Sequence, residues 1–120
     1  MGHMEQSLSD FLSGKTEHTR RLFARLITEF EAIGEVRVHA AKSMICIGRK
    51  RNFAYVIYLG KDFLDLVLPF KQTFEDNLCF KKIKPVPGSD DFNHHLRIQH
   101  LDDFNEEVFK YMKMAWQGAS

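Results

Sequence analysis

The chain has 120 residues and a formal net charge of +1, so it has the size of one domain and no overall excess of charge. Its hydrophobic content of 44%, which includes eleven Phe, is enough for one core and excludes a disordered or low-complexity chain. Attraction for anions must therefore come from local patches of charge. No apolar run approaches the ~20 residues that a membrane-spanning helix needs, so no membrane partner is expected.

The N-terminal residues indicate where the native domain starts. Residues 1–3, Met-Gly-His, read as an expression scar before a native start at Met4, and we interpret residues 4–120 as a single domain. The polar segment after Met4 lacks the apolar centre of a signal peptide, which predicts a cytoplasmic protein. Cys46 and Cys79 stand at no zinc-ligand spacing and are expected to be free thiols.

Helical periodicity predicts three helices, at residues 7–13, residues 16–33 and residues 102–116. Thr16 is the expected N-cap of the second helix, and Asp102 and Asp103 are expected to open the third with carboxylates at its positive end. The two longer helices each carry an apolar stripe: Leu22, Phe23, Leu26, Ile27, Phe30 and Ile33 in one, and Phe104, Val108, Tyr111, Met112 and Ala115 in the other.

Alternation and apolar runs between turn residues predict strands at residues 36–39, 43–47, 53–59, 63–68, 78–83 and 93–99. Pro69 is expected to end the fourth strand. The second and third runs are almost entirely apolar, which predicts strands covered on both faces. The element order predicts a two-layer α+β domain. It has an antiparallel sheet of about five to six strands, two N-terminal helices and one C-terminal helix, with the two longer helices on one face.

Residues 36–58 are the stretch where a ligand is expected, because they contain five basic residues and no carboxylate: Arg37, Lys42, Arg49, Lys50 and Arg51. Guanidinium groups suit phosphate or carboxylate, and beside the aromatic rings of Phe53 and Tyr55 they suit nucleic acid. The alternative is a solvated hairpin turn without a ligand. Arg49→Glu with Arg51→Glu is expected to abolish any nucleic-acid binding and to leave the fold intact, because surface changes usually cost within ~0.5 kcal/mol.

Other side chains could join this basic stretch. Lys42 and Ser43 follow a corner in the chain. They could face a cleft, or they could have only a local structural role at the start of a strand. Because neighbouring residues in a strand point to opposite faces, a Ser–Lys catalytic pair is disfavoured. The expected polar sheet face carries Arg37 and His39, together with His95, Arg97 and Gln99. The candidate ligand-binding residues are Arg37, His39, Lys42, Ser43, Arg49, Arg51, His94 and Arg97. A core-edge His94 bonded to backbone is the alternative to a site role.

Several short motifs have a familiar order: Phe11-Leu12-Ser13-Gly14-Lys15, Lys42-Ser43-Met44-Ile45, Arg51-Asn52-Phe53-Ala54, and the His94 to Arg97 stretch before Asp102-Asp103. Together they resemble a family of small, mainly bacterial domains catalogued as domain of unknown function 5655. The resemblance covers nearly the whole chain from Met4. It implies an α+β domain that is sometimes attached to larger proteins. It implies no activity, because the family has none assigned, so function must be argued from the residues.

Three hypotheses of function follow. The first is a non-enzymatic binding module for an anionic ligand, either nucleic acid or a small phosphorylated or carboxylated molecule. The second is a protein-interaction or dimerisation domain, using a sheet edge and apolar residues such as Phe70, Phe74 and Trp116. The third is an enzyme of unrecognised type with Lys42 and His94 in a cleft. No Gly-rich phosphate loop, nucleophile elbow or kinase signature is present, and no cofactor or metal is expected.

Overall fold

The computed structural model describes residues 3–119, with the side chains of residues 8–119. Met1 and Gly2 of the expected expression scar lie outside the described residues, and the first helix begins at His3. The elements in chain order are α1 (His3–Leu12), α2 (Glu17–Ile33), β1 (Arg37–Ala40), β2 (Ile45–Gly48), β3 (Asn52–Leu59), β4 (Leu64–Phe70), β5 (Lys82–Pro85), β6 (Phe92–Ile98), η1 (Leu101–Asp103) and α3 (Glu106–Gln117). This order confirms the α+β class.

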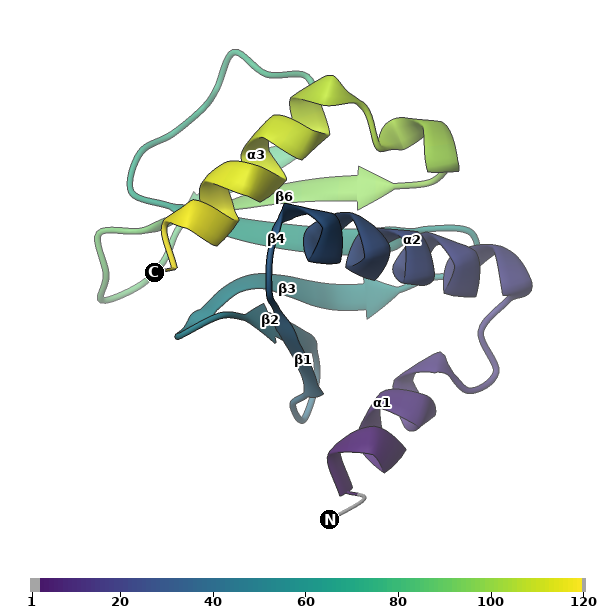
Figure 1. Cartoon of the computed structure of the whole chain (residues 1–120). Helices are drawn as coiled ribbons and strands as arrows, with labels where there is room; N and C mark the ends of the chain where they lie inside the picture. The colour runs from purple at the N-terminus through teal and green to yellow at the C-terminus, as the bar shows by residue number, and fades with distance from the viewer. Residues whose placement is uncertain (1–2, 120) are drawn as a thin grey trace.

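The strands form one antiparallel sheet in the order β1-β2-β3-β4-β6-β5. One row of cross-strand partners, Ile45, Val56, Leu66 and Leu96, is buried and belongs to the core. Since cross-strand partners point to the same face, this row marks the face that the helices cover. Figure 1 shows α2 and α3 lying across that face, while α1 lies against β1 at the sheet edge.

The two longer helices bury the stripes that their periodicity predicts. Leu26 and Phe30 of α2 and Phe104, Val108 and Met112 around α3 are buried, whereas Ile27 is half-buried. The helices are also capped by side chains, which satisfies N–H groups that have no partner inside a helix. Thr16 Oγ1 accepts from Thr19 N–H at 3.1 Å, and Asn105 Oδ1 accepts from Val108 N–H at 3.0 Å.

The expected start of the last helix at Asp102 and Asp103 is wrong. These residues lie in the short 3₁₀ turn η1, and α3 begins at Glu106 after the Asn105 cap. The Asp103 carboxylate accepts instead from the N–H groups of Gln99 and His100, at 2.8 and 3.0 Å. The Asp103 carboxylate therefore fixes the chain where it leaves β6. A different residue, Asn105, caps α3.

Two strand boundaries also differ from expectation. The segment expected as a strand at residues 78–83 is mostly a loop, with Leu78 98% exposed, and β5 covers Lys82–Pro85 instead. Pro69 does not end β4, which continues to Phe70 and pairs there with β6. The proline is tolerated because β3 and β4 pair only from Tyr55↔Val67 onward, so no ladder bond to β3 is lost at Pro69.

Neither of the two main helices covers the second face of the sheet. Its central row is His39, Cys46, Tyr55, Val67, His95 and Lys82, which are cross-strand partners. We call this surface the open face. The expectation that β3 is covered on both faces is wrong, since Ile57 is 36% exposed and Tyr58 57% exposed. A shift in the β3–β4 register between Val56 and Tyr58 places Ile57 as the extra residue of a bulge.

Both thiols are unpaired in the structure. Burial raises the pKa of Cys46. Burial, together with the charge and hydrogen bond of Glu107, raises the pKa of Cys79 to about 12. Both groups therefore stay protonated at neutral pH and behave as small apolar side chains. None of the helices in the described part of the chain has the length and apolar character to cross a membrane.

Candidate functional site

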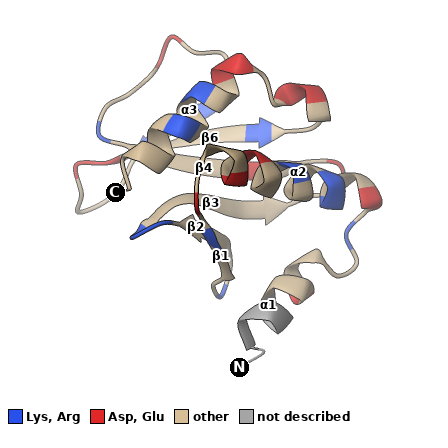
Figure 2. Ribbon diagram, viewed as in Figure 1, with Lys and Arg blue, Asp and Glu red and all other residues tan. Residues whose placement is uncertain are grey.

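The basic turn between β2 and β3 packs against the C-terminal end of α3, as Figure 2 shows by the Lys and Arg colouring. Arg49 donates to the Trp116 carbonyl at 3.1 Å and Arg51 to the Gly118 carbonyl at 2.6 Å. The Arg49 guanidinium also lies 3.6 Å from the centre of the Trp116 ring. Arg37 donates to the Arg49 carbonyl. Arg49 and Arg51 therefore donate to carbonyls at the negative, C-terminal end of α3, and the Trp116 carbonyl also accepts from Ala119 N–H at 3.2 Å.

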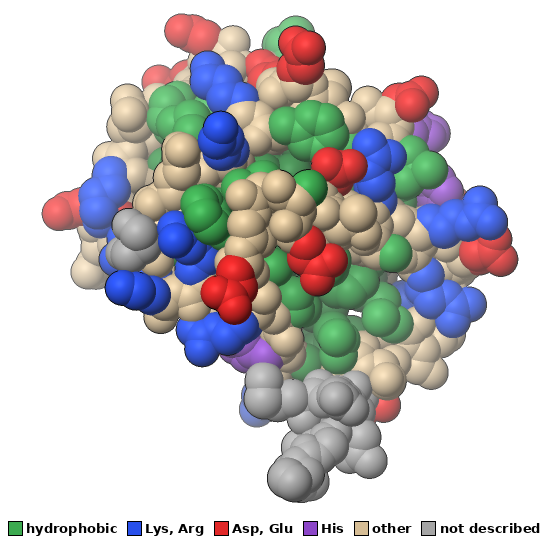
Figure 3. Space-filling model, viewed as in Figure 1, with side chains coloured by type: hydrophobic (Ala, Val, Ile, Leu, Met, Phe, Trp, Pro, Cys, Tyr) green, Lys and Arg blue, Asp and Glu red, His purple; other side chains and the backbone are tan. Residues whose placement is uncertain are grey.

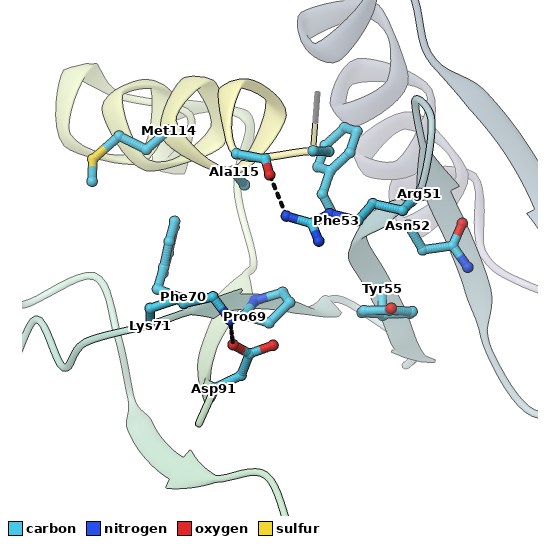
Figure 4. A pocket seen from close by; sticks show the side chains of 12 residues that line it. Arg51, Asn52, Phe53, Tyr55, Pro69, Phe70, Lys71, Asp91, Met114 and Ala115 are labelled. Atoms are coloured by element: carbon cyan, nitrogen blue, oxygen red, sulfur yellow. Dashed lines mark hydrogen bonds and ion pairs between the residues drawn. The ribbon is translucent and has the colours of Figure 1, made fainter. Parts of the chain in front are cut away.

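On one side of this turn, β3 and β4 diverge and leave a slot. The sheet pairing stops at Tyr55↔Val67, although β3 starts at Asn52 and β4 ends at Phe70. The slot has a volume of about 400 Å³, and Met114 and Ala115 of α3 close one side of it (Figure 4). Its volume falls within the range of small-molecule sites, roughly 300–1,000 Å³. Polar and apolar groups line it in similar measure, which suits an amphipathic ligand.

Five polar side chains line the slot: Arg51, Asn52, Tyr55, Lys71 and Asp91. Lys71 Nζ lies 2.8 Å from Asp91 Oδ1, so these two charges largely compensate each other. Arg51 has five N–H groups, of which the hydrogen bond to Gly118 uses one. Figure 4 shows its guanidinium extending from the β2–β3 turn toward the α3 end, above Pro69 and Asp91. The local charge is positive, and the main donor for an anion is Arg51.

A second hollow of about 330 Å³, the face hollow, lies on the open face and shares Tyr55, Pro69 and Asp91 with the slot. Its lining is mainly apolar and includes Met44, Ile57, Val67 and Val86, with Asn93 and His95 as polar members. Val67 is only 3% exposed and forms a floor. The slot and the face hollow therefore adjoin each other at these three side chains, and Arg51 and Lys71 lie at the slot end.

Arg97 does not join the basic turn. Its guanidinium makes two hydrogen bonds to Asp65, of 2.8 and 3.0 Å, and lies 3.8 Å from the centre of the Phe63 ring. Burial raises the pKa of Asp65, but the hydrogen bonds and charges of Arg97 and Lys81 outweigh it and hold that pKa below its usual value. Asp65 pairs with Tyr58, six residues along β3 from Asn52, which is about 20 Å of strand. The expected convergence of Arg97 with Arg49 and Arg51 is wrong.

Lys42 and Ser43 lie apart from both hollows. They are exposed in the β1–β2 connection, and the expected strand at residues 43–47 begins only at Ile45. Lys42 lines a shallow depression with Asp10 and Phe11 of α1. His39 lies half-buried on the open face opposite Cys46. Of the expected set, the structure brings together Arg37, Arg49 and Arg51.

His94 is a core residue. It is fully buried and lies between the rings of Phe70, Phe74 and Phe80, with centroid distances of 5.0, 5.5 and 4.9 Å. Phe74 N–H donates to His94 Nε2 at 3.1 Å, so Nδ1 carries the proton and donates to the Phe92 carbonyl at 2.9 Å. Burial lowers its pKa, with the backbone hydrogen bonds acting in the opposite direction. The neutral ring thus fastens the loop after β4 to β6.

We expect His94 to make the free energy of unfolding fall below about pH 6.5, since the unfolded ring binds a proton more readily than the buried one. The contribution of His94 to stability is complete above the pKa that His94 has in the unfolded chain. It is lost as the pH falls toward the lower pKa that His94 has in the folded protein. His94→Gln should flatten the change in urea midpoint between about pH 7.5 and pH 5. His95→Gln measures the second contribution to the profile, because burial and neighbouring lysines also lower the His95 pKa. A His94→Gln profile identical to that of the wild type would contradict the assignment.

The sequence reasoning missed most of the slot and the face hollow. Asn52, Lys71 and Asp91 come from three separate strand ends and share no motif. Two features of the sequence pointed to this region. Pro69 lies inside a strand pattern, and the β3 segment has more apolar residues than a strand buried on one face requires. Within the described residues no three His, Cys, Asp or Glu side chains stand together as a metal site.

The family model for domain of unknown function 5655 matches residues 8–119. The match spans nearly all of the described residues, so the chain belongs to this family. No curated protein matches the chain, and no solved structure matches it.

Proposed function

We propose that this domain is a binding module for a small organic anion, which occupies the slot with its carboxylate or phosphate at Arg51. The observation that supports the proposal is the slot itself, a hollow of about 400 Å³ opened where β3 and β4 diverge. Apolar side chains such as Phe53 and Phe70 line it beside the cations. Small-molecule sites commonly combine an apolar lining with a few converging polar groups.

The polar groups of the slot match an anion better than a neutral or cationic ligand. Arg51 offers further guanidinium N–H groups, and Tyr55 of β3 lies near it, whereas the Asn52 amide points away from the guanidinium (Figure 4). Lys71 could donate a further N–H group to an incoming anion while its ion pair with Asp91 is kept. Charge-assisted hydrogen bonds of this kind contribute more than neutral ones.

A small molecule fits the distribution of charge better than nucleic acid does. The basic side chains at the α3 end form a compact group, whereas Arg97 is paired to Asp65 at the far end of the strands. Figure 3 shows Lys and Arg gathered at the lower left of the view, over the β2–β3 turn, and separated from the basic side chains on the right. A nucleic-acid strand would require a continuous basic track.

The test is calorimetric titration of the domain with phenyl phosphate and with benzoate. We expect Arg51→Gln to weaken binding of either probe by roughly 10–150-fold, the equivalent of one hydrogen bond to a charged group. The matched control is Arg49→Gln, because Arg49 also donates to a carbonyl at the end of α3 but lies outside the slot. Arg49→Gln should leave the affinity within about threefold of the wild type.

Equal losses in the two variants would show a general effect on α3 and would contradict the proposed site. Binding of short oligonucleotides at low salt, lost at moderate salt, would favour the nucleic-acid hypothesis instead. A mass that rises with concentration would favour dimerisation, for which the exposed Ile57 and Tyr58 on the open face are the observation.

A further inference from the structure

We infer that the ligand of the slot is an anion with a linear apolar chain, and that the chain lies in the face hollow. This inference rests on the proposed function and adds the class of ligand. It also assigns a role to the apolar side chains of the open face, which the anion site alone leaves unexplained. A short anion such as butanoate would fill only the slot.

The first argument is adjacency. The two hollows share the side chains of Tyr55, Pro69 and Asp91, so a ligand that reaches past these side chains would pass directly from the slot onto the open face. The path follows β4 from Lys71 back to Val67, which is about 13 Å of strand. The direction is fixed by charge, because Arg51 and Lys71 line only the slot.

The second argument is the chemistry of the lining. Aliphatic side chains of Met44, Ile57 and Val86 surround the face hollow, and Val67 forms its floor. Met is unbranched and adapts its shape to irregular apolar groups. The face hollow itself contains neither Arg nor Lys, so it offers no second anion site among its described lining residues. An apolar chain gains free energy there by leaving water.

The third argument is that the fold exposes these groups for local reasons. Alternation along β3 places Ile57 on the open face with Tyr55, and the bulge between Val56 and Tyr58 leaves Ile57 without a partner residue on β4. Pro69 lines both hollows at the point where the strands diverge, and it has no N–H that pairing with β3 would require. The sheet irregularities that open the slot also shape the face hollow.

The experiment compares linear carboxylates from butanoate to octanoate by calorimetric titration. We expect the affinity to rise by roughly fourfold for each methylene group that becomes buried. The double variant Met44→Gln with Ile57→Thr should weaken octanoate by at least about tenfold and leave butanoate within about twofold. Leu78→Gln is the matched control, because Leu78 is 98% exposed and lies away from both hollows.

The outcomes separate this inference from the proposed function. Equal affinity for butanoate and octanoate, with both weakened by Arg51→Gln, would overturn the apolar chain and retain the anion site. No binding of either probe would overturn both. Co-sedimentation with phosphatidylglycerol vesicles that depends on Met44 and Ile57 would overturn a free ligand in favour of a membrane lipid. Octanoate binding that needs both Arg51 and the Met44–Ile57 pair would support the inference.

Discussion

Replacing Leu26 by Ala is expected to lower the free energy of unfolding by about 2–5 kcal/mol, and Phe104→Ala should have an effect of similar size. Leu26 is 0% exposed in α2, and Phe104 is 5% exposed immediately before α3. Each side chain belongs to the single core between the helices and the sheet. Removing it leaves a cavity that well-packed neighbours fill only in part.

The measurement is the urea midpoint and slope of each variant by circular dichroism. Leu78→Ala is the matched control, since it deletes the same atoms from a side chain that is 98% exposed. That control should stay within about 0.5 kcal/mol of the wild type. A Leu26→Ala variant as stable as Leu78→Ala would contradict the two-layer packing of α2 on the sheet.

The double replacement Arg49→Glu with Arg51→Glu should cost about 2–4 kcal/mol of stability, in contrast to the neutral effect that the sequence suggested. It removes the hydrogen bonds to the Trp116 and Gly118 carbonyls and the contact of Arg49 with the Trp116 ring. It also places two carboxylates at the negative end of α3. We expect the last turn of α3 to loosen from the β2–β3 turn.

Lys50→Glu is the control for charge at this turn. Lys50 is exposed between the two arginines, and within the described residues it makes no hydrogen bond to α3. Reversing the charge of Lys50 should leave the free energy of unfolding, measured from the urea midpoint, within about 0.5 kcal/mol of the wild type. Trp116 fluorescence gives an independent readout, because its indole N–H donates to the Glu35 carbonyl at 3.0 Å beside Arg49. An unchanged midpoint and spectrum in the double variant would refute the capping role.

The candidate site could be predicted only in part. The stretch of residues 36–58 did contain Arg51, Asn52 and Tyr55, which line the slot. The charge pattern could not distinguish the roles of Arg51 and Arg97. Both are arginines in the sequence, but only the structure shows that Arg97 pairs with Asp65 and that Arg51 lines the slot. Pairing is decided by which strands are neighbours, and Asp65 meets Arg97 through the β4–β6 register.

The sequence by itself determined the α+β class, the apolar stripes of α2 and α3 and the approximate place of most strands. These features depend on local periodicity, caps and turns, which act over a few residues. The prediction of a strand at residues 78–83 was wrong because Phe80 packs against His94, and this tertiary contact outweighs the local preference for a strand.

Only the tertiary structure decided where a ligand can enter. The slot requires β3 and β4 to diverge beyond Tyr55↔Val67 and the end of α3 to lie beside them. That placement depends on arginine–carbonyl hydrogen bonds between groups 67 residues apart in the chain. Contacts at such separation leave no periodic trace in the sequence, because loop closure and sheet order set them rather than neighbouring residues.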